Sequence, residues 1–209
     1  MRFFKTPRLV SGLLPGLTWR QPGAGKTIYL TFDDGPIPDV TEFVLEELNQ
    51  YQAQATFFCV GENLFRNPNI ALKVVAAGHR LGNHTYNHLR GWKTPDQTYL
   101  QNTAKCQNEL EKFYPEASPK LFRPPHGRCT LQQYRQLKVN YKLIMWDVLT
   151  YDFDAHLSPE KCLQKSILNT RPGSIVVFHD SLKARRNMQY VLPRYLTHFS
   201  GLGFEFKSL

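Results

Sequence analysis

The stretch TIYLTFDDGP, residues 27–36, decides how the rest of the sequence is interpreted. Its first part is rich in β-branched and aromatic residues, which predicts a strand over residues 26–32. Two adjacent carboxylates, Asp33 and Asp34, follow at once, and a Gly-Pro pair then marks a turn. Like charges side by side repel each other, and a turn needs only one aspartate. This is either an ordinary strand-to-turn exit or a place where a nearby positive charge stabilises both carboxylates.

The chain of 209 residues is long enough for one substantial hydrophobic core. Nothing in the sequence divides it, so we expect a single domain over residues 1–209. Hydrophobic residues make up 42% and charged residues 21% of the chain, as in an ordinary globular domain. No apolar run approaches the roughly 18 residues that a membrane span requires, so we predict no integral membrane segment. The sequence makes no prediction of oligomeric state.

The N-terminus and the cysteines bear on the cellular compartment. Early basic residues and a short apolar patch suggest a signal peptide only weakly, because Pro15 interrupts the patch and no small-residue cleavage site follows. We therefore prefer a cytoplasmic location. The cysteines are scattered without a C-x-x-C pair, which predicts buried reduced thiols rather than a thiolate zinc site. They are Cys59, Cys106, Cys129 and Cys162.

The net charge of +9 raises the question of an anionic partner such as nucleic acid. Basic residues are spread along the chain, with one local cluster over residues 182–194 that we interpret as a solvated face. No RNA-recognition, zinc-finger or helix-turn-helix signature accompanies the charge. We therefore predict no nucleic-acid partner.

Predicted strands alternate with predicted helices, which is typical of the α/β class. The strands are short and mostly apolar, as when both faces of a sheet are covered, and either a barrel or an open doubly wound sheet fits the pattern. The predicted strands are 26–32, 54–60, 79–81, 120–123, 141–147, 173–178 and 204–207. The predicted helices are 38–51, 62–77 and 94–113, the last with Thr94 as N-cap, and further helices begin near Thr130 and Ser158.

Polar residues gather at the carboxyl ends of the predicted strands. In a parallel barrel those ends share one face, which is where active sites are built. We therefore expect side chains that are distant in the sequence to converge there. They are Asp33, Asp34, His84, His88, Arg123, Asp152 and His179.

The segment HTYNH, residues 84–88, has two histidines at a spacing that can direct both imidazoles toward one metal ion. By itself the spacing is weak evidence for a metal site and favours surface or capping histidines. Zinc catalytic sites commonly use three protein ligands, and one aspartate with His84 and His88 supplies that set. The other carboxylate of the Asp33-Asp34 pair is then free to act as a general base toward water. A cation here also explains why adjacent carboxylates are tolerated.

Five motifs occur in a characteristic order: TFDDGP, HTYNH, RPPHG at 123–127, a segment with Trp146-Asp147 and Asp152-Phe153, and IVVFHD at 175–180. Together they resemble the polysaccharide deacetylase family, the NodB-homology or carbohydrate esterase family 4 domain, over residues 26–180. The resemblance implies a distorted, incomplete (β/α) barrel of about seven parallel strands. It also implies removal of acetyl groups from polysaccharides with a divalent metal. Imidazole and carboxylate ligands suit zinc, with cobalt, nickel or iron as alternatives.

The resemblance further assigns a role to each polar residue at the strand ends. Asp34 matches the carboxylate ligand of the metal, and His84 and His88 match the imidazole ligands. Asp33 matches the catalytic base. Arg123 matches the arginine that pairs with this base, and a neighbouring guanidinium keeps a carboxylate ionised.

Further matches concern the leaving group and the oxyanion. His179 matches the general acid that protonates the leaving amine, and Asp152 matches the carboxylate that orients the imidazole and raises its pKa. Asp147 remains an alternative partner for the acid. The backbone N–H of His126 matches an oxyanion donor. Trp146 we interpret as a core residue.

Two positions depart from the family pattern. His126 stands where a tyrosine is usual, and Phe153 stands where a tryptophan is usual. Phe153 and Val177 match the residues that line the small apolar pocket for the acetyl methyl group. Neither departure removes a catalytic group, so we expect activity, with an effect on substrate preference.

The leading hypothesis is a metal-dependent hydrolase that releases acetate from an N-acetylated glycan, peptidoglycan-like or chitin-like. A near alternative hydrolyses other C–N bonds in the same site, such as those of small cyclic amides. Alternatives from other classes are a non-catalytic glycan-binding module and a nucleic-acid binder driven by charge. A glycan substrate would favour the cell envelope, so that location stays open beside the cytoplasm.

Overall fold

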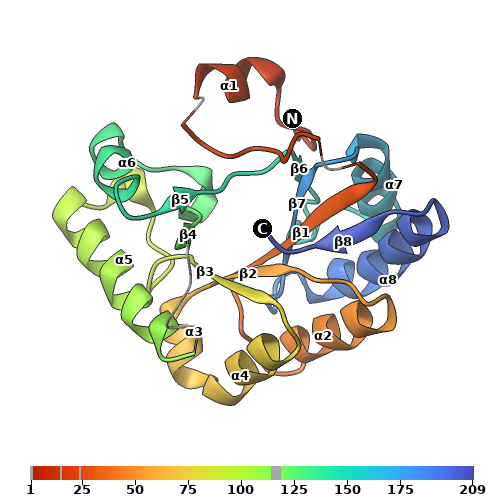
Figure 1. Ribbon diagram of the computed structural model, residues 1–209, viewed down its shortest axis with the longest axis horizontal. Helices are drawn as coiled ribbons and strands as arrows, with labels where there is room; N and C mark the ends of the chain where they lie inside the picture. Colours follow the sequence, from red (N-terminus) through yellow and green to blue (C-terminus); the bar gives the residue numbers. More distant parts are fainter. Residues whose placement is uncertain (1, 15, 24, 114–118) are drawn as a thin grey trace.

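A computed structural model describes residues 2–14, 16–23, 25–113 and 119–209. Its centre is one sheet in which seven strands follow the order β5-β4-β3-β2-β1-β7-β6, while β8 pairs with the start of β1 (Figure 1). The strands are β1 (Thr27–Asp33), β2 (Thr56–Cys59), β3 (Arg80–Asn83), β4 (Leu121–Phe122), β5 (Lys142–Leu143), β6 (Val148–Leu149), β7 (Ile175–His179) and β8 (Glu205–Lys207).

Every strand pairing in this sheet is parallel. No ladder joins β5 to β6 within the described residues, so the sheet curls without closing. The predicted α/β class and the incomplete barrel of about seven parallel strands are confirmed, and the open doubly wound sheet is not formed. Parallel strands require crossover connections, which the helices supply.

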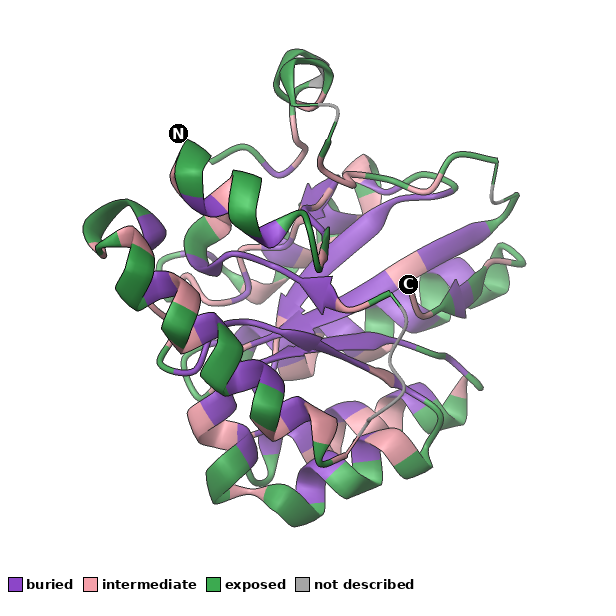
Figure 2. Ribbon diagram, turned by 60° about the vertical axis from the view of Figure 1, so that its left-hand side comes forward, coloured by how far each residue is buried: buried purple, intermediate pink, exposed green. Residues whose placement is uncertain are grey.

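The helices lie around the outside of the curled sheet (Figure 1). Figure 2 shows that the strands are mostly buried, whereas the helices bury one side and expose the other. The helices are α1 (Arg8–Leu13), α2 (Val40–Gln50), α3 (Gly61–Arg66), α4 (Pro68–Ala76), α5 (Asp96–Glu111), α6 (Leu131–Leu137), α7 (Pro159–Asn169) and α8 (Arg185–Gly201), with two short 3-10 turns, η1 (Gly91–Lys93) and η2 (Pro125–Gly127). Within the described residues, every helix is too short or too polar to traverse a bilayer.

Strand β1 lies at the centre of the core. Phe32 stacks against Phe57 of β2 and Phe178 of β7, with ring centroids 5.0 and 5.8 Å away. Such aromatic pairs contribute about 0.5–1.5 kcal/mol each beyond the burial of their surface. This packing fixes the three strands whose carboxyl ends carry the polar residues described below.

Several predicted elements differ from the structure. The helix expected over 62–77 is two helices, because Pro68 disfavours helical geometry at Asn67, which has φ −127° and ψ 54°. The N-cap of α5 is Pro95 and not Thr94. The strand expected over 141–147 shrinks to β5, and the chain then pairs again as β6.

Helices α1 and α8 were not predicted. Helix α8 buries one apolar side that includes Met188, Leu192 and Phe199. The arginines of the basic cluster at 182–194 lie on its exposed side, as the interpretation of a solvated face requires. Three of the four cysteines are buried, Cys129 is half-buried, and all four are free thiols.

The N-terminal segment lies beside the opening between β5 and β6. Isolated bridges pair Lys5 with Val148, Thr18 with Ile144 and Arg20 with Ser174. The described residues among 2–20 therefore attach to both edges of the opening, although these residues contribute no strand of their own to the sheet.

Candidate active site

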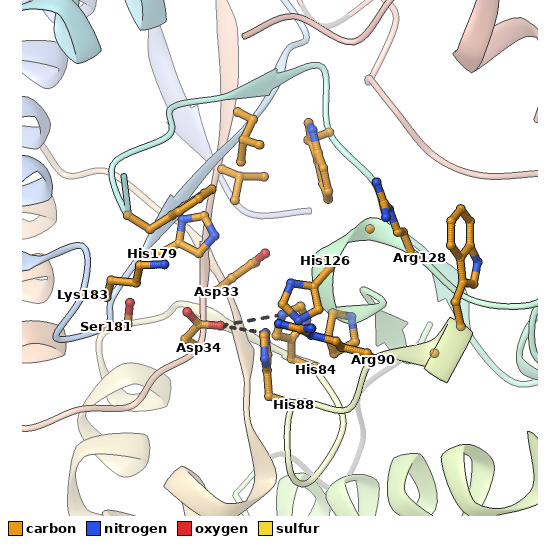
Figure 3. Close-up of a pocket in the computed structure, with 18 of the residues that line it drawn as sticks. Asp33, Asp34, His84, His88, Arg90, His126, Arg128, His179, Ser181 and Lys183 are labelled. Atoms are coloured by element: carbon orange, nitrogen blue, oxygen red, sulfur yellow. Dashed lines mark ion pairs between the residues drawn. The ribbon is translucent and has the colours of Figure 1, made fainter. Parts of the chain in front are cut away.

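A cavity of about 890 Å³ opens at the carboxyl ends of the strands. It is lined by residues from five segments of the chain, within 33–37, 84–93, 125–128, 146–153 and 177–183, and Figure 3 labels most of the polar ones. Among its lining residues are most of the predicted site residues: Asp33, Asp34, His84, His88, His126, Phe153, Val177 and His179. Arg123 and Asp152 do not line the cavity, but Arg123 is hydrogen-bonded to Asp33 and Asp152 to His179. The predicted convergence is therefore observed.

The DDGP turn directs its two carboxylates to different partners. Asp33 is the last residue of β1 and lies in register with His179 of β7. Asp34 leaves the strand with φ 90°, a left-handed conformation that is strained for aspartate. Its backbone is held by Phe58, whose carbonyl accepts the Asp34 N–H at 3.2 Å, and by Asn63, whose side chain donates to the Asp34 carbonyl at 2.7 Å.

The side chain of Asp180 holds the segment that follows Asp34 in place. The Asp180 carboxylate accepts the backbone N–H of Gly35 at 3.0 Å and the hydroxyl of Thr41 at 2.6 Å. Burial raises the pKa of Asp180 to about 8. A side chain on Gly35 would overlap this carboxylate, so glycine is required there by close approach.

The two histidines of HTYNH are not on a helix. They belong to a loop after β3 in which Thr85 and His88 have φ values of 63° and 53°. The side chain of Asn102 on α5 holds this loop by accepting the backbone N–H groups of Tyr86 and Asn87, at 2.8 and 3.1 Å. The spacing of the motif predicted the pair, but the physical basis is a strained, tethered loop and not a helical face.

Asp34, His84 and His88 form a cluster that fits a metal ion. Their candidate ligand atoms all lie within 4.8 Å of one another, and His88 Nε2 is 3.2 Å and His84 Nε2 is 3.9 Å from Asp34 Oδ1 (Figure 3). His84 Nδ1 is 2.8 Å from the Arg123 carbonyl, which accepts a hydrogen bond from Nδ1–H, so that Nε2 keeps its lone pair for a ligand role. The donor set and the tautomer both suit a divalent cation.

The electrostatics of the cluster agree with that fit. Burial lowers the pKa of His84 to about 4, so its imidazole is neutral near pH 7, as a ligand must be. Burial acts to raise the pKa of Asp34, but the hydrogen bond from His88 and the nearby imidazoles outweigh it, and the pKa lies well below its ordinary value. The carboxylate is therefore ionised.

Asp33 is paired with a fully buried arginine. Arg123 Nη1 donates to Asp33 Oδ1 at 2.6 Å, and the guanidinium lies 4.1 Å from the centre of the Phe58 ring. Its other donors bond Thr31 and the carbonyls of Ile144 and Met145. A guanidinium with this many partners is held in one position, so it also fixes the orientation of the Asp33 carboxylate.

His179 is paired with Asp152 and not with Asp147. The ring Nδ1 of His179 is 2.8 Å from Asp152 Oδ1, and its backbone N–H donates to Asp152 Oδ2 at 2.7 Å. Burial acts to lower the pKa of His179, but the Asp152 charge and hydrogen bond outweigh it and raise the pKa to about 9. Asp147 instead accepts from the hydroxyl of Ser174 at 2.6 Å, away from the cavity.

An apolar recess lies beside His179. It is formed by Phe153, Val177 and Leu149, and the Phe153 ring meets the imidazole edge-on with centroids 4.8 Å apart. On the opposite side, His126 has φ 57°, and among the described residues its backbone N–H donates no hydrogen bond. The cavity thus has a small apolar space next to His179 and, at His126, a backbone N–H that is free to bind a ligand.

Several lining residues were not predicted. Trp146 is half-buried and lines the cavity next to Gly127, so the interpretation as a core residue is wrong. Arg90, Trp92, Arg128 and Lys183 also line the cavity. The signal for two of them was present in the sequence, because the run LRGWK directly follows the second histidine of HTYNH.

Comparisons with known proteins agree with this arrangement. The family profile described as polysaccharide deacetylase matches residues 20–143. A peptidoglycan-N-acetylglucosamine deacetylase of Bacillus cereus is 34% identical over 192 residues, covering 91% of this chain and 89% of that protein. A chitooligosaccharide deacetylase of Azorhizobium caulinodans is 33% identical over 155 residues, covering 74% of this chain and 73% of that protein.

Solved crystal structures share this fold. A crystal structure of a peptidoglycan N-acetylglucosamine deacetylase in complex with 4-naphthalen-1-yl-N-oxidanyl-benzamide superposes with a TM-score of 0.87 at 28% identity. The alignment covers 98% of this chain and 95% of that one.

Proposed function

The chain belongs to the polysaccharide deacetylase family, and we propose that it hydrolyses acetyl groups from an N-acetylated glycan with a divalent metal ion. One observation carries the proposal. A carboxylate paired with a buried guanidinium, an imidazole paired with a buried carboxylate, and the Asp34, His84 and His88 cluster line the same cavity. This provides a base, an acid and a metal-ligand set in one cavity.

Asp34, His84 and His88 would hold the metal ion. When bound, a divalent cation supplies Lewis-acid polarisation of water and of the acetyl carbonyl. The Arg123 carbonyl keeps His84 in the tautomer that a ligand needs. Imidazole and carboxylate donors support zinc as the metal, with cobalt, nickel and iron as the alternatives.

Asp33 is the proposed general base. Its pairing with Arg123 fixes the direction of the carboxylate oxygens. It takes the proton from the attacking water as the new C–O bond forms. The free N–H of His126 is the proposed donor to the oxyanion that develops on the acetyl oxygen.

His179 is the proposed general acid. With a pKa raised to about 9 it is protonated near pH 7, and it donates that proton to the amine nitrogen as the C–N bond breaks. Phe153 and Val177 support a place for the acetyl methyl group next to this acid. The products are acetate and a glycan with a free amino group.

The test is a panel of acetate-release assays on the purified chain, with metal content measured on the same sample. The expected result is one metal ion per chain and acetate release from N-acetylglucosamine oligomers or from peptidoglycan fragments. Hydrolysis of small cyclic amides without acetate release from any glycan would overturn the glycan assignment. Glycan binding without turnover in the metal-loaded protein would instead support a non-catalytic module.

A further inference from the structure

One end of the cavity has a positively charged edge that the proposed chemistry does not use. Arg90 and Arg128 line the cavity on the side of His88 and His126, opposite Lys183 and Ser181 (Figure 3). Both arginines are exposed, and in the part of the chain that the structure describes neither forms an ion pair. Among the described residues that line the cavity, the carboxylates are those of Asp33 and Asp34, and they are already engaged by Arg123 and by the histidines.

Trp92 provides a flat apolar surface at the same edge. Its side chain is 64% exposed, yet its Nε1–H donates to the Cys129 carbonyl at 2.7 Å and the Arg128 guanidinium lies 4.8 Å from its ring. An exposed tryptophan with a satisfied N–H and one restrained orientation loses little entropy when a ligand stacks on it. Tryptophan residues with a bonded N–H and an accessible ring face are common at binding interfaces.

The loop that presents Trp92 is firmly attached to the scaffold. Gly91 approaches the backbone of residues 128 and 129 so closely that a side chain there would overlap it. The fully buried Gln133 side chain donates to the carbonyls of Gly91 and Thr94, at 3.1 and 3.3 Å. The edge formed by Arg90, Trp92 and Arg128, which we call the cationic rim, is therefore held in a defined geometry before any ligand binds.

We propose that the cationic rim is a subsite for an acidic sugar. Trp92 stacks on a pyranose ring adjacent to the unit that loses its acetyl group, and Arg90 and Arg128 bind a carboxylate substituent of the glycan. This inference rests on the proposed function and narrows its substrate to N-acetylated glycans that carry carboxylates. It separates the two polymers named for the relatives, because peptidoglycan carries lactyl and peptide carboxylates whereas chitooligosaccharides are neutral.

The chemistry of the rim favours a carboxylate. Two guanidinium groups offer paired N–H donors that match the two oxygens of a carboxylate, and the aromatic face beside them matches the C–H face of a sugar ring. The rim adjoins the cavity at His126 and His88, so a chain bound there continues directly to the metal-ligand cluster.

Binding to the Asp33→Asn variant tests the proposal without turnover. The probes are a tetrasaccharide of alternating N-acetylglucosamine and N-acetylmuramic acid, and the same tetrasaccharide with its lactyl carboxylates converted to methyl esters. Calorimetry should give about tenfold tighter binding of the acid, and this difference should shrink as salt is raised from 50 to 500 mM. Equal binding of acid and ester would overturn the proposal.

Substitutions in the cationic rim test whether its residues cause the preference for the acid over the ester. Arg90→Gln combined with Arg128→Gln should bring the affinity for the acid down to that for the ester, while Trp92→Ala should weaken both by a similar factor. Arg194→Gln, an exposed arginine of α8 outside the cavity, is the charge control and should preserve the preference. A preference that survives the double substitution would overturn the subsite, and so would duplex DNA that binds as tightly as the acid and is lost in the same variant.

The two proposals fail in different ways. Equal acetate release by the wild-type chain from acid and ester would leave the deacetylase function intact and overturn the subsite. Rim-dependent preference for the acid without acetate release from any glycan would support the subsite and overturn the function.

Discussion

Asp152 binds His179 with both of its carboxylate oxygens, one to the ring Nδ1 at 2.8 Å and the other to the backbone N–H at 2.7 Å. The imidazole is thereby fixed in orientation as well as in charge. Its Nε2 is left to face the cavity, where a leaving amine needs a proton. The relationship leads directly to a pH dependence.

Activity should fall as the pH rises through about 9, because His179 must be protonated to act as an acid and its pKa is about 9. Asp152→Asn removes the charge that raises this pKa and leaves burial, which lowers it. The alkaline limb of kcat/KM against pH should therefore move down by roughly 1 unit or more. Asp147→Asn is the control for the alternative partner, and a limb that moved in this variant but not in Asp152→Asn would reverse the assignment.

Asp33→Asn should retain the metal and lose turnover. The amide oxygen can still accept from Arg123, so the fold and the proposed ligand set should be preserved while the proposed base is removed. General bases contribute roughly 10²–10⁴-fold, and kcat should fall by that factor. Metal analysis and acetate release on one preparation measure both quantities. Turnover at the wild-type rate would assign the base to another group.

His84→Ala should lose the metal and the activity together. In the wild-type chain, added zinc should raise the melting temperature, because a ligand that binds only the folded state stabilises it by about 2.7 kcal/mol at 100 times its dissociation constant. In the variant this stabilisation should be absent. His198→Ala, which changes an exposed histidine of α8, is the matched control and should respond to zinc like the wild type.

Gly35→Ala should destabilise the fold. The added methyl group would overlap the buried Asp180 carboxylate, and overpacking of this kind costs about 1–3 kcal/mol. Urea denaturation measures the change in the free energy of unfolding. Gly201→Ala at the end of α8 is the control, since nothing lies within 4 Å of its added methyl group, and it should be neutral or slightly stabilising.

Phe153→Trp should narrow the acyl specificity. Phe153 lines the recess beside His179, and a larger ring leaves less room for an acyl chain longer than acetyl. One methylene in an apolar pocket typically changes kcat/KM by roughly 10–200-fold. The ratio of acetyl to propionyl release from matched glucosamine oligomers should therefore rise. An unchanged ratio would move the acyl pocket elsewhere in the cavity.

The sequence predicted the Asp, His and Arg residues at the strand ends better than it predicted the loop residues that line the rest of the cavity. Strand-end positions are encoded locally, because an apolar run followed by Asp33 or by His179 already places that residue at the shared face. The partner of the proposed acid was left open between Asp147, the last residue of the strand predicted over 141–147, and Asp152 shortly after it. The loop after β6 is what brings Asp152 to His179.

The fold was predicted at the level of class, and its errors have local causes. Pro68 divides one expected helix, and Pro95 displaces the N-cap expected at Thr94. Helix α8 was missed because its basic residues mask a buried apolar side that is stabilised by tertiary contacts. Trp146 could not be placed from the sequence, because its exposure depends on how distant loops pack around the cavity.

The pairing of Asp33 with His179 across β1 and β7 has a consequence for how such an enzyme changes over time. The proposed base and acid are register partners in adjacent parallel strands. The hydrogen bonds between these strands keep the two backbones about 4.8 Å apart. The loops at the mouth, by contrast, take no part in that strand pairing. Substitutions in these loops can therefore change which polymer binds without changing the spacing between Asp33 and His179.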